Sequence, residues 1–164
     1  MRAAARYAAC GHGGVALASG ESPRDEDAPA ARLDLSPLGN AVERLREGLE
    51  RHRREPGDEQ LRDGLIQRFE FTYELSHRML RRYLRHVAAS PDAFDGMPFQ
   101  DLIRSANEQG LLLGDWAAWR RYRDMRARTS HTYAAGIAAQ VVDAIPGFLA
   151  EATYLRDQLA RRLA

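Results

Sequence analysis

Lysine is absent from this chain, and cysteine nearly so. All 24 basic side chains are arginine, and because 23 acidic side chains almost cancel them, the formal net charge is only +1. The overall charge therefore does not indicate binding to nucleic acid or a membrane surface, and any basic patch must be local. The single cysteine, Cys10, cannot form an internal disulfide, and no Cys/His set has the spacing of a zinc site. We expect a cytoplasmic protein with no metal and no cofactor.

The familiar catalytic motifs are missing as well. The sequence has no phosphate-binding glycine loop, no HExxH, no paired-carboxylate motif and no GxSxG elbow. No apolar run approaches the roughly 20 residues that span a membrane. These absences argue against the enzymes that depend on such motifs and against a membrane location.

The composition divides the chain into an extension and one domain. Residues 21–32, ESPRDEDAPAAR, are charged and contain proline, which is typical of a disordered linker. We predict a disordered or weakly ordered extension over residues 1–32 and a single folded domain over residues 33–164, a size that suits one hydrophobic core.

From Leu33 onward, apolar residues recur at helical spacing and no window alternates as a strand would. Ser36 is the expected cap of a first helix that ends before Pro56, and a second runs from about residue 58 to 87. Pro98 opens a short third helix, Asp115 caps a fourth, and the last begins near residue 135. The sequence therefore predicts an all-α, up-and-down bundle of four long helices plus one short helix.

Arginines cluster at helical spacing on two of these helices. The second carries Arg78, Arg81, Arg82 and Arg85, and the fourth adds Arg123 and Arg128 as candidates. Such a cluster is either a solvated face or a surface that binds RNA or an acidic partner. On the second helix we also expect Glu70 and Glu74 to be structural. Glu74 can pair with Arg78, and Glu70 can pair with the neighbours of Asp63 or with a partner.

The segment MRARTSHTY, residues 125–133, lies where the fourth helix should end. It places four residues between Arg126 and His131, and Tyr133 follows two positions later. Considered alone, these residues favour a structural role: histidine at a helix junction often caps backbone groups, and Thr129 and Ser130 are ordinary turn formers.

A second segment changes that interpretation. The stretch LRDGLIQRFEFTYELS, residues 61–76, together with RTSHTY, residues 128–133, resembles the nucleotidyltransferase substrate-binding proteins of the HEPN superfamily. The similarity covers roughly residues 33–160. It implies a helical bundle that forms a two-fold homodimer and works beside a separately encoded minimal nucleotidyltransferase, as toxin and antitoxin do in related systems.

The resemblance also assigns roles to three residues. The superfamily's hallmark is an arginine followed by a histidine, which Arg126 and His131 satisfy, and in related toxins this pair cleaves RNA. Tyr133 matches the tyrosine that receives AMP from the partner enzyme. Histidine can carry a proton near neutral pH, and arginine can bind the phosphate.

Three functions follow as alternatives. The chain is an accessory partner of a nucleotidyltransferase, an active metal-independent RNase silenced at Tyr133, or a helical interaction module without chemistry.

Overall fold

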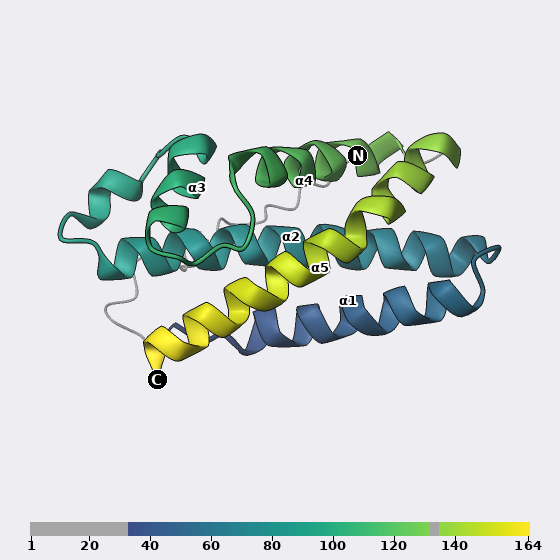
Figure 1. Cartoon of the computed structure of the whole chain (residues 1–164), viewed down its shortest axis with the longest axis horizontal. Coiled ribbons are helices and arrows are strands. Elements are labelled where there is room, and N and C mark those ends of the chain that lie inside the picture. The colour runs from purple at the N-terminus through teal and green to yellow at the C-terminus, as the bar shows by residue number, and fades with distance from the viewer. Residues whose placement is uncertain (1–32, 132–134) are drawn as a thin grey trace, which may run out of the picture. The chain divides into compact units, whose positions relative to one another are not determined.

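The computed structural model describes residues 33–131 and 135–164, and this part of the chain is all-α, as predicted (Figure 1). The α-helices are α1 (Ser36–Arg54), α2 (Glu59–Val87), α3 (Phe99–Glu108), α4 (Trp116–Arg128) and α5 (Ala135–Leu163). Two short 3₁₀ helices, η1 (Pro91–Phe94) and η2 (Thr129–His131), precede α3 and α5 respectively. Helices α1, α2, α4 and α5 run back and forth along the bundle, and α3 is a short helix near one end (Figure 1). None of the helices in these residues is long and apolar enough to cross a membrane.

Two aspartates cap the helices that carry the candidate site. The Asp58 side chain accepts the backbone N–H groups of Gln60 at 2.8 Å and Leu61 at 3.0 Å. The Asp115 side chain accepts the N–H of Ala118 at 3.0 Å. Because the first N–H groups of a helix have no partner within it, these contacts fix where α2 and α4 begin.

The predicted cap of α1 is wrong by one residue. Leu35, not Ser36, is the cap residue, and its side chain makes no capping hydrogen bond. Instead the Asp34 carboxylate accepts the backbone N–H of Ser36 at 2.9 Å. The aspartate therefore binds the backbone N–H of Ser36 itself, at the first residue of the helix.

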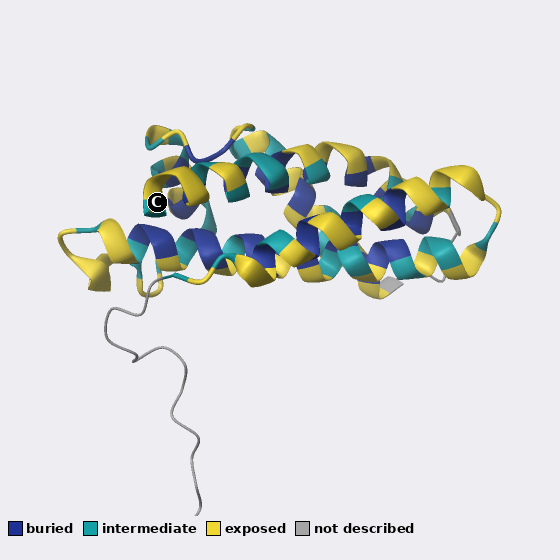
Figure 2. Cartoon of the chain, turned by 90° about the horizontal axis from the view of Figure 1, so that it is seen from below, coloured by how far each residue is buried: buried dark blue, intermediate teal, exposed yellow. Residues whose placement is uncertain are grey.

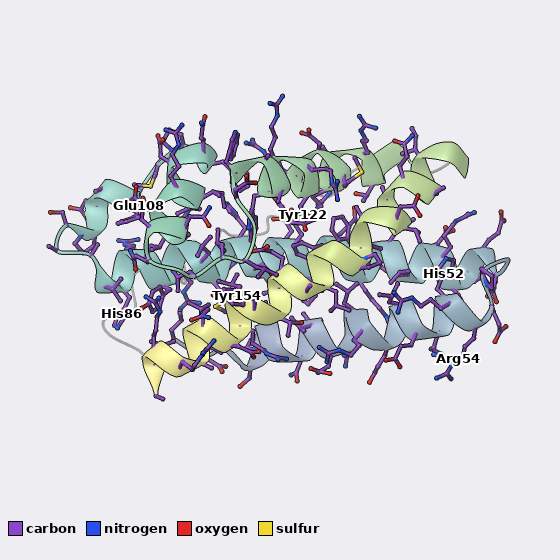
Figure 3. All side chains as sticks on the ribbon, viewed as in Figure 1. His52, Arg54, His86, Glu108, Tyr122 and Tyr154 are labelled. Atoms are coloured by element: carbon purple, nitrogen blue, oxygen red, sulfur yellow. The ribbon has the colours of Figure 1, made fainter. Side chains whose placement is uncertain are left out.

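The core is drawn from all five helices, whose buried residues face one another while exposed residues face outward (Figure 2). Phe148 of α5 lies in its aromatic part. Its ring centroid is 5.1 Å from that of Phe69, 5.9 Å from Tyr73 and 5.2 Å from Tyr122. Tyr122 accordingly lies on the inner side of α4 (Figure 3). These contacts pack α4 against α2 and α5.

A buried carboxylate fixes the start of α4. Glu151 of α5 is only 2 % exposed. It accepts the backbone N–H groups of Leu113 at 2.9 Å and Gly114 at 2.7 Å, and the indole N–H of Trp119 at 3.0 Å. Gly114 has no room for a side chain, since a Cβ there would lie 2.8 Å from the Cβ of Ala118. Glu151 therefore ties the loop before α4, and α4 itself, to α5.

Candidate functional site

The predicted motif lies at the junction of α4 and η2. Helix α4 ends at Arg128 and η2 follows, so the helix does end within MRARTSHTY, as predicted. His131 is the last residue of η2, and the position of its side chain is not described. Tyr133 lies outside the described residues. The site is therefore built from Arg126 and the groups around it.

Arg126 contacts two carboxylates of α2. Its Nε donates to Glu74 at 3.0 Å, and its Nη1 donates to Glu70 at 3.2 Å. Thr129 of η2 completes the group: its hydroxyl lies 3.3 Å from the same Nη1, donates to Glu70 and contacts the backbone carbonyl of Arg126 at 2.7 Å. We call Glu70, Glu74, Arg126 and Thr129 the Arg126 cluster.

The Arg126 cluster lies at the surface, but it is not fully open to solvent. Side-chain exposure is 33 % for Arg126, 31 % for Glu70 and 50 % for Glu74. Two carboxylates face one guanidinium, so these charges sum to −1. Arginine has five N–H donors, and within the described residues no hydrogen bond involves Nη2 of Arg126. Nε and Nη1 of the guanidinium are therefore bound within the protein, whereas the N–H groups of Nη2 are available to another molecule.

The partner predicted for Glu74 differs in the structure. We expected an ion pair within α2 with Arg78, but in the described part of the chain the ion pair of Glu74 is with Arg126 of α4. Glu70 and Glu74 lie one turn apart and both reach Arg126, whereas Arg78 is exposed. The sequence signal was the spacing of four between two glutamates, which places them on one helix face.

The arginine cluster of α2 divides into two pairs. Arg81 donates to the backbone carbonyls of Phe94 at 2.8 Å and Met97 at 3.2 Å, and Arg85 pairs with Asp95 at 3.2 Å. These two arginines hold η1 and the loop after it against α2.

The other pair, Arg78 and Arg82, is exposed. Across residues 33–131 and 135–164, neither of them forms an ion pair. Of the four predicted binding residues on α2, they are the two whose charges are available to a partner.

The predicted binding residues on α4 also form contacts within the bundle. Arg123 lies over the ring of Phe99, 4.9 Å from its centroid, and Nη1 of Arg128 donates to Gln140 at 2.8 Å. On the outer side of α4, Arg120 and Arg121 line an open hollow of about 420 Å³ with Arg128. Arg120 and Arg121 were not among the predicted binding residues, although the run of arginines in α4 made them visible in the sequence.

Burial changes the pKa of two groups of α2 that are not part of the Arg126 cluster. Burial raises the pKa of Tyr73 to about 12, so its phenol stays neutral. Burial also lowers the pKa of His77 below its usual 6.5, and the positive charge of Arg81 lowers it further. Nε2 of His77 is buried and has no hydrogen-bond partner within the described residues. Both groups belong to the packing of α2.

Comparisons with known proteins agree with the resemblance that the sequence suggested. The model of a family described as nucleotidyltransferase substrate binding protein like matches residues 33–161. A Haemophilus influenzae protein named probable ribonuclease HepT is 44 % identical over 99 residues, which cover 60 % of this chain and 67 % of that protein.

Two solved structures are similar in fold. One, from Haemophilus influenzae, is described as the fold of a substrate binding domain of a nucleotidyltransferase. It is 36 % identical with a TM-score of 0.73, and the match covers 77 % of this chain and 99 % of that one. The other, from Thermus thermophilus, is 28 % identical with a TM-score of 0.54, and the match covers 77 % of this chain and 98 % of that one.

Proposed function

Because the chain belongs to the nucleotidyltransferase substrate binding protein like family, we propose that it is the accessory partner of a separately encoded minimal nucleotidyltransferase. We propose further that the two proteins form a cytoplasmic toxin–antitoxin pair, in which this chain is the HEPN half. The observation that carries the proposal is the family match over residues 33–161, which includes helices α1 to α4, all but the last two residues of α5, and the motif at the end of α4.

A second function, metal-independent RNA cleavage, is favoured by the relative named probable ribonuclease. In this reaction His131 takes the proton of a ribose 2′-OH, the 2′-oxygen attacks the adjacent phosphorus, and the bond to the 5′-oxygen breaks. A proton returns to that leaving oxygen, from the imidazolium of His131 or of a second copy. Arg126 binds the phosphate, on which negative charge builds up, with the N–H groups that the Arg126 cluster leaves available.

Modification of Tyr133 would then control the RNase. The tyrosine oxygen attacks the α-phosphate of ATP held by the partner enzyme, AMP is transferred and pyrophosphate leaves. The added phosphate brings negative charge to a site that must bind the phosphate of RNA, and it therefore opposes binding.

A two-fold homodimer would complete the site, because one chain supplies one arginine–histidine pair. The surface beside the Arg126 cluster fits such a contact. Phe71 of α2 lies three residues before Glu74 and therefore next to it on the helix surface. It is 62 % exposed, one of few large apolar side chains that the described residues leave open to solvent. A second copy would bury it.

The third alternative, an interaction module without chemistry, rests on the exposed arginines. Arg78 and Arg82 on α2, and Arg120 and Arg121 on α4, offer positive charge to an acidic partner or to RNA.

The test is RNA integrity in cells that express this chain alone or with its partner nucleotidyltransferase. We compare wild type with His131→Ala at equal protein level. The control is His86→Ala, which removes an exposed histidine at the far end of α2 (Figure 3). Degradation by wild type and the His86 variant, but not by the His131 variant, would establish the RNase.

Loss of degradation on co-expression, together with AMP on Tyr133 in the mass spectrum, would establish the paired system. Intact RNA in every strain would refute the RNase function. If RNA stays intact and the two proteins also fail to co-purify, the chain is not the accessory partner that we propose.

A further inference from the structure

The Arg126 cluster holds the guanidinium in one orientation. Glu74 accepts from Nε and Glu70 accepts from Nη1, so two different nitrogens of one planar group are fixed by two successive turns of α2. Thr129 in turn contacts both Glu70 and the backbone carbonyl of Arg126. The side chain cannot rotate without breaking several of these contacts together.

Stability alone does not account for two carboxylates here. Ion pairs at this degree of exposure contribute little to folding, since solvent screens them. Glu70 and Glu74 are also like charges at a spacing of four on one helix, which is unfavourable. One carboxylate would neutralise Arg126, whereas the second leaves the group with a net negative charge.

That net negative charge repels the phosphates of RNA. It lies beside the guanidinium that would bind the scissile phosphate, and it therefore weakens the attraction between the site and a polyanion. The arrangement combines a precisely held arginine with weaker binding of the substrate. Such a combination favours turnover over tight binding.

Resting on the RNase function proposed above, we propose that Glu70 and Glu74 are positioning residues for Arg126. They orient its guanidinium so that the N–H groups of Nη2 meet the phosphate that carries charge in the transition state. At the same time they limit how tightly the ground-state RNA binds.

The proposal predicts that both KM and kcat decrease when the charge of Glu70 or Glu74 is removed. In Glu70→Gln and Glu74→Gln the amide oxygen can still accept a hydrogen bond, but the charge is gone. We expect KM for a 5′-labelled, mixed-sequence, single-stranded RNA oligonucleotide to fall about threefold, the effect of one unit charge removed at about 6 Å in water. We expect kcat to fall about tenfold or more, because Arg126 is less well oriented.

The matched control is Glu59→Gln. Glu59 is also on α2 and also pairs with an arginine, Arg62 at 3.4 Å, but it is 79 % exposed and far along the helix from the cluster. Both kinetic constants should stay at their wild-type values. A structural role for Glu70 and Glu74 predicts a different result: kcat would fall with the folded fraction while KM stayed constant.

A second measurement does not depend on cleavage. The Nε–H of Arg126 gives a ¹⁵N–¹H NMR signal that Arg126→Ala identifies by its loss. Exchange of this Nε–H with water should be slow in wild type and in Glu59→Gln. It should be faster in Glu74→Gln, because a neutral amide oxygen accepts a weaker hydrogen bond than a carboxylate does.

The outcomes separate the inference from the function on which it rests. If wild type does not cleave RNA, the RNase function fails, and the positioning role fails with it. If wild type cleaves but kcat rises in the glutamine variants, the two glutamates inhibit Arg126 rather than position it. If wild type cleaves and Nε–H exchange is equally fast in all proteins, Arg126 is not held in solution. Either of the last two results overturns the inference alone.

Discussion

Glu151→Gln is the substitution that most directly tests how α4 is held in place. In the wild type, Oε1 accepts the N–H groups of Leu113 and Trp119, and Oε2 accepts the N–H of Gly114. Glutamine has the same shape but only one acceptor oxygen. If that oxygen takes the place of Oε1, the amide NH₂ faces the N–H of Gly114, and two donors oppose each other.

The cost follows from the burial of these groups. A hydrogen bond to a charged group contributes about 1.5–3 kcal/mol, and an unpaired buried donor costs about 1–3 kcal/mol. Since Glu151 is only 2 % exposed, little of this is screened by water. Removing a buried charge acts in the opposite direction, because the desolvation of the carboxylate is relieved. We expect a net loss of about 2 kcal/mol, which lowers the Tm of a domain of this size by about 6 °C.

The assay is thermal unfolding followed by circular dichroism at pH 7. Glu59→Gln, the same substitution at an exposed position, should leave the Tm unchanged. Gly114→Ala should also lower it, since the new Cβ would lie 3.0 Å from Oε2 of Glu151. If Glu151→Gln unfolds at the wild-type temperature, the three contacts do not fix α4 and the reasoning is refuted.

Three further predictions concern other parts of the molecule. Because burial keeps the pKa of His77 below 6.5, the unfolded chain takes up a proton before the folded one as the pH falls, so folding stability decreases below about pH 6.5; thermal unfolding should show a smaller decrease for His77→Phe. Deleting residues 1–32 should leave the Tm unchanged, since helices α1 to α5 supply their own core. A large decrease would show that the folded domain begins before residue 33. Phe71→Glu should convert a dimer into monomers in light scattering, and an unchanged mass would exclude Phe71 from the interface.

Local features of the fold could be predicted from the sequence. The periodic apolar residues predicted all five helices, and Asp115 was identified as a cap because capping depends on residues only a few positions apart. The error at Ser36 was also local: Ser36 is the first residue of the helix, and the carboxylate of Asp34, two residues earlier, accepts its N–H. The family resemblance, carried by residues 61–76 and 128–133, was confirmed by the match over residues 33–161.

The contacts that build the site could not be predicted in this way. Arg126 is 56 positions from Glu70, and Trp119 is 32 positions from Glu151. Helical spacing shows which residues share a face but not which helix that face meets. Glu74 therefore had a plausible partner in Arg78, and only the packing of α4 on α2 shows that Arg126 is closer.

One signal for Glu151 was present in the sequence. It lies three residues after Phe148 and four before Leu155, and both of these are fully buried. A glutamate on the apolar face of α5 indicates a buried carboxylate, which needs donors to be stable. Which donors it binds still depends on the loop before α4.

Helix α4 depends on polar contacts more than α1 and α2 do, because it buries fewer apolar residues. Trp119 and Tyr122 are the buried residues of this helix, whereas α2 and α1 bury long stripes. Hydrophobic burial has no preferred direction, so two aromatic side chains hold α4 against the bundle without fixing its rotation. Hydrogen bonds are directional, and carboxylates of two other helices bind α4 near its two ends: Glu151 at Trp119, and Glu70 and Glu74 at Arg126. The orientation of α4 therefore depends on three acidic side chains, of which Glu70 and Glu74 contact the motif arginine directly. Substitutions of Glu70 and Glu74 should change the orientation of Arg126 while the bundle remains folded.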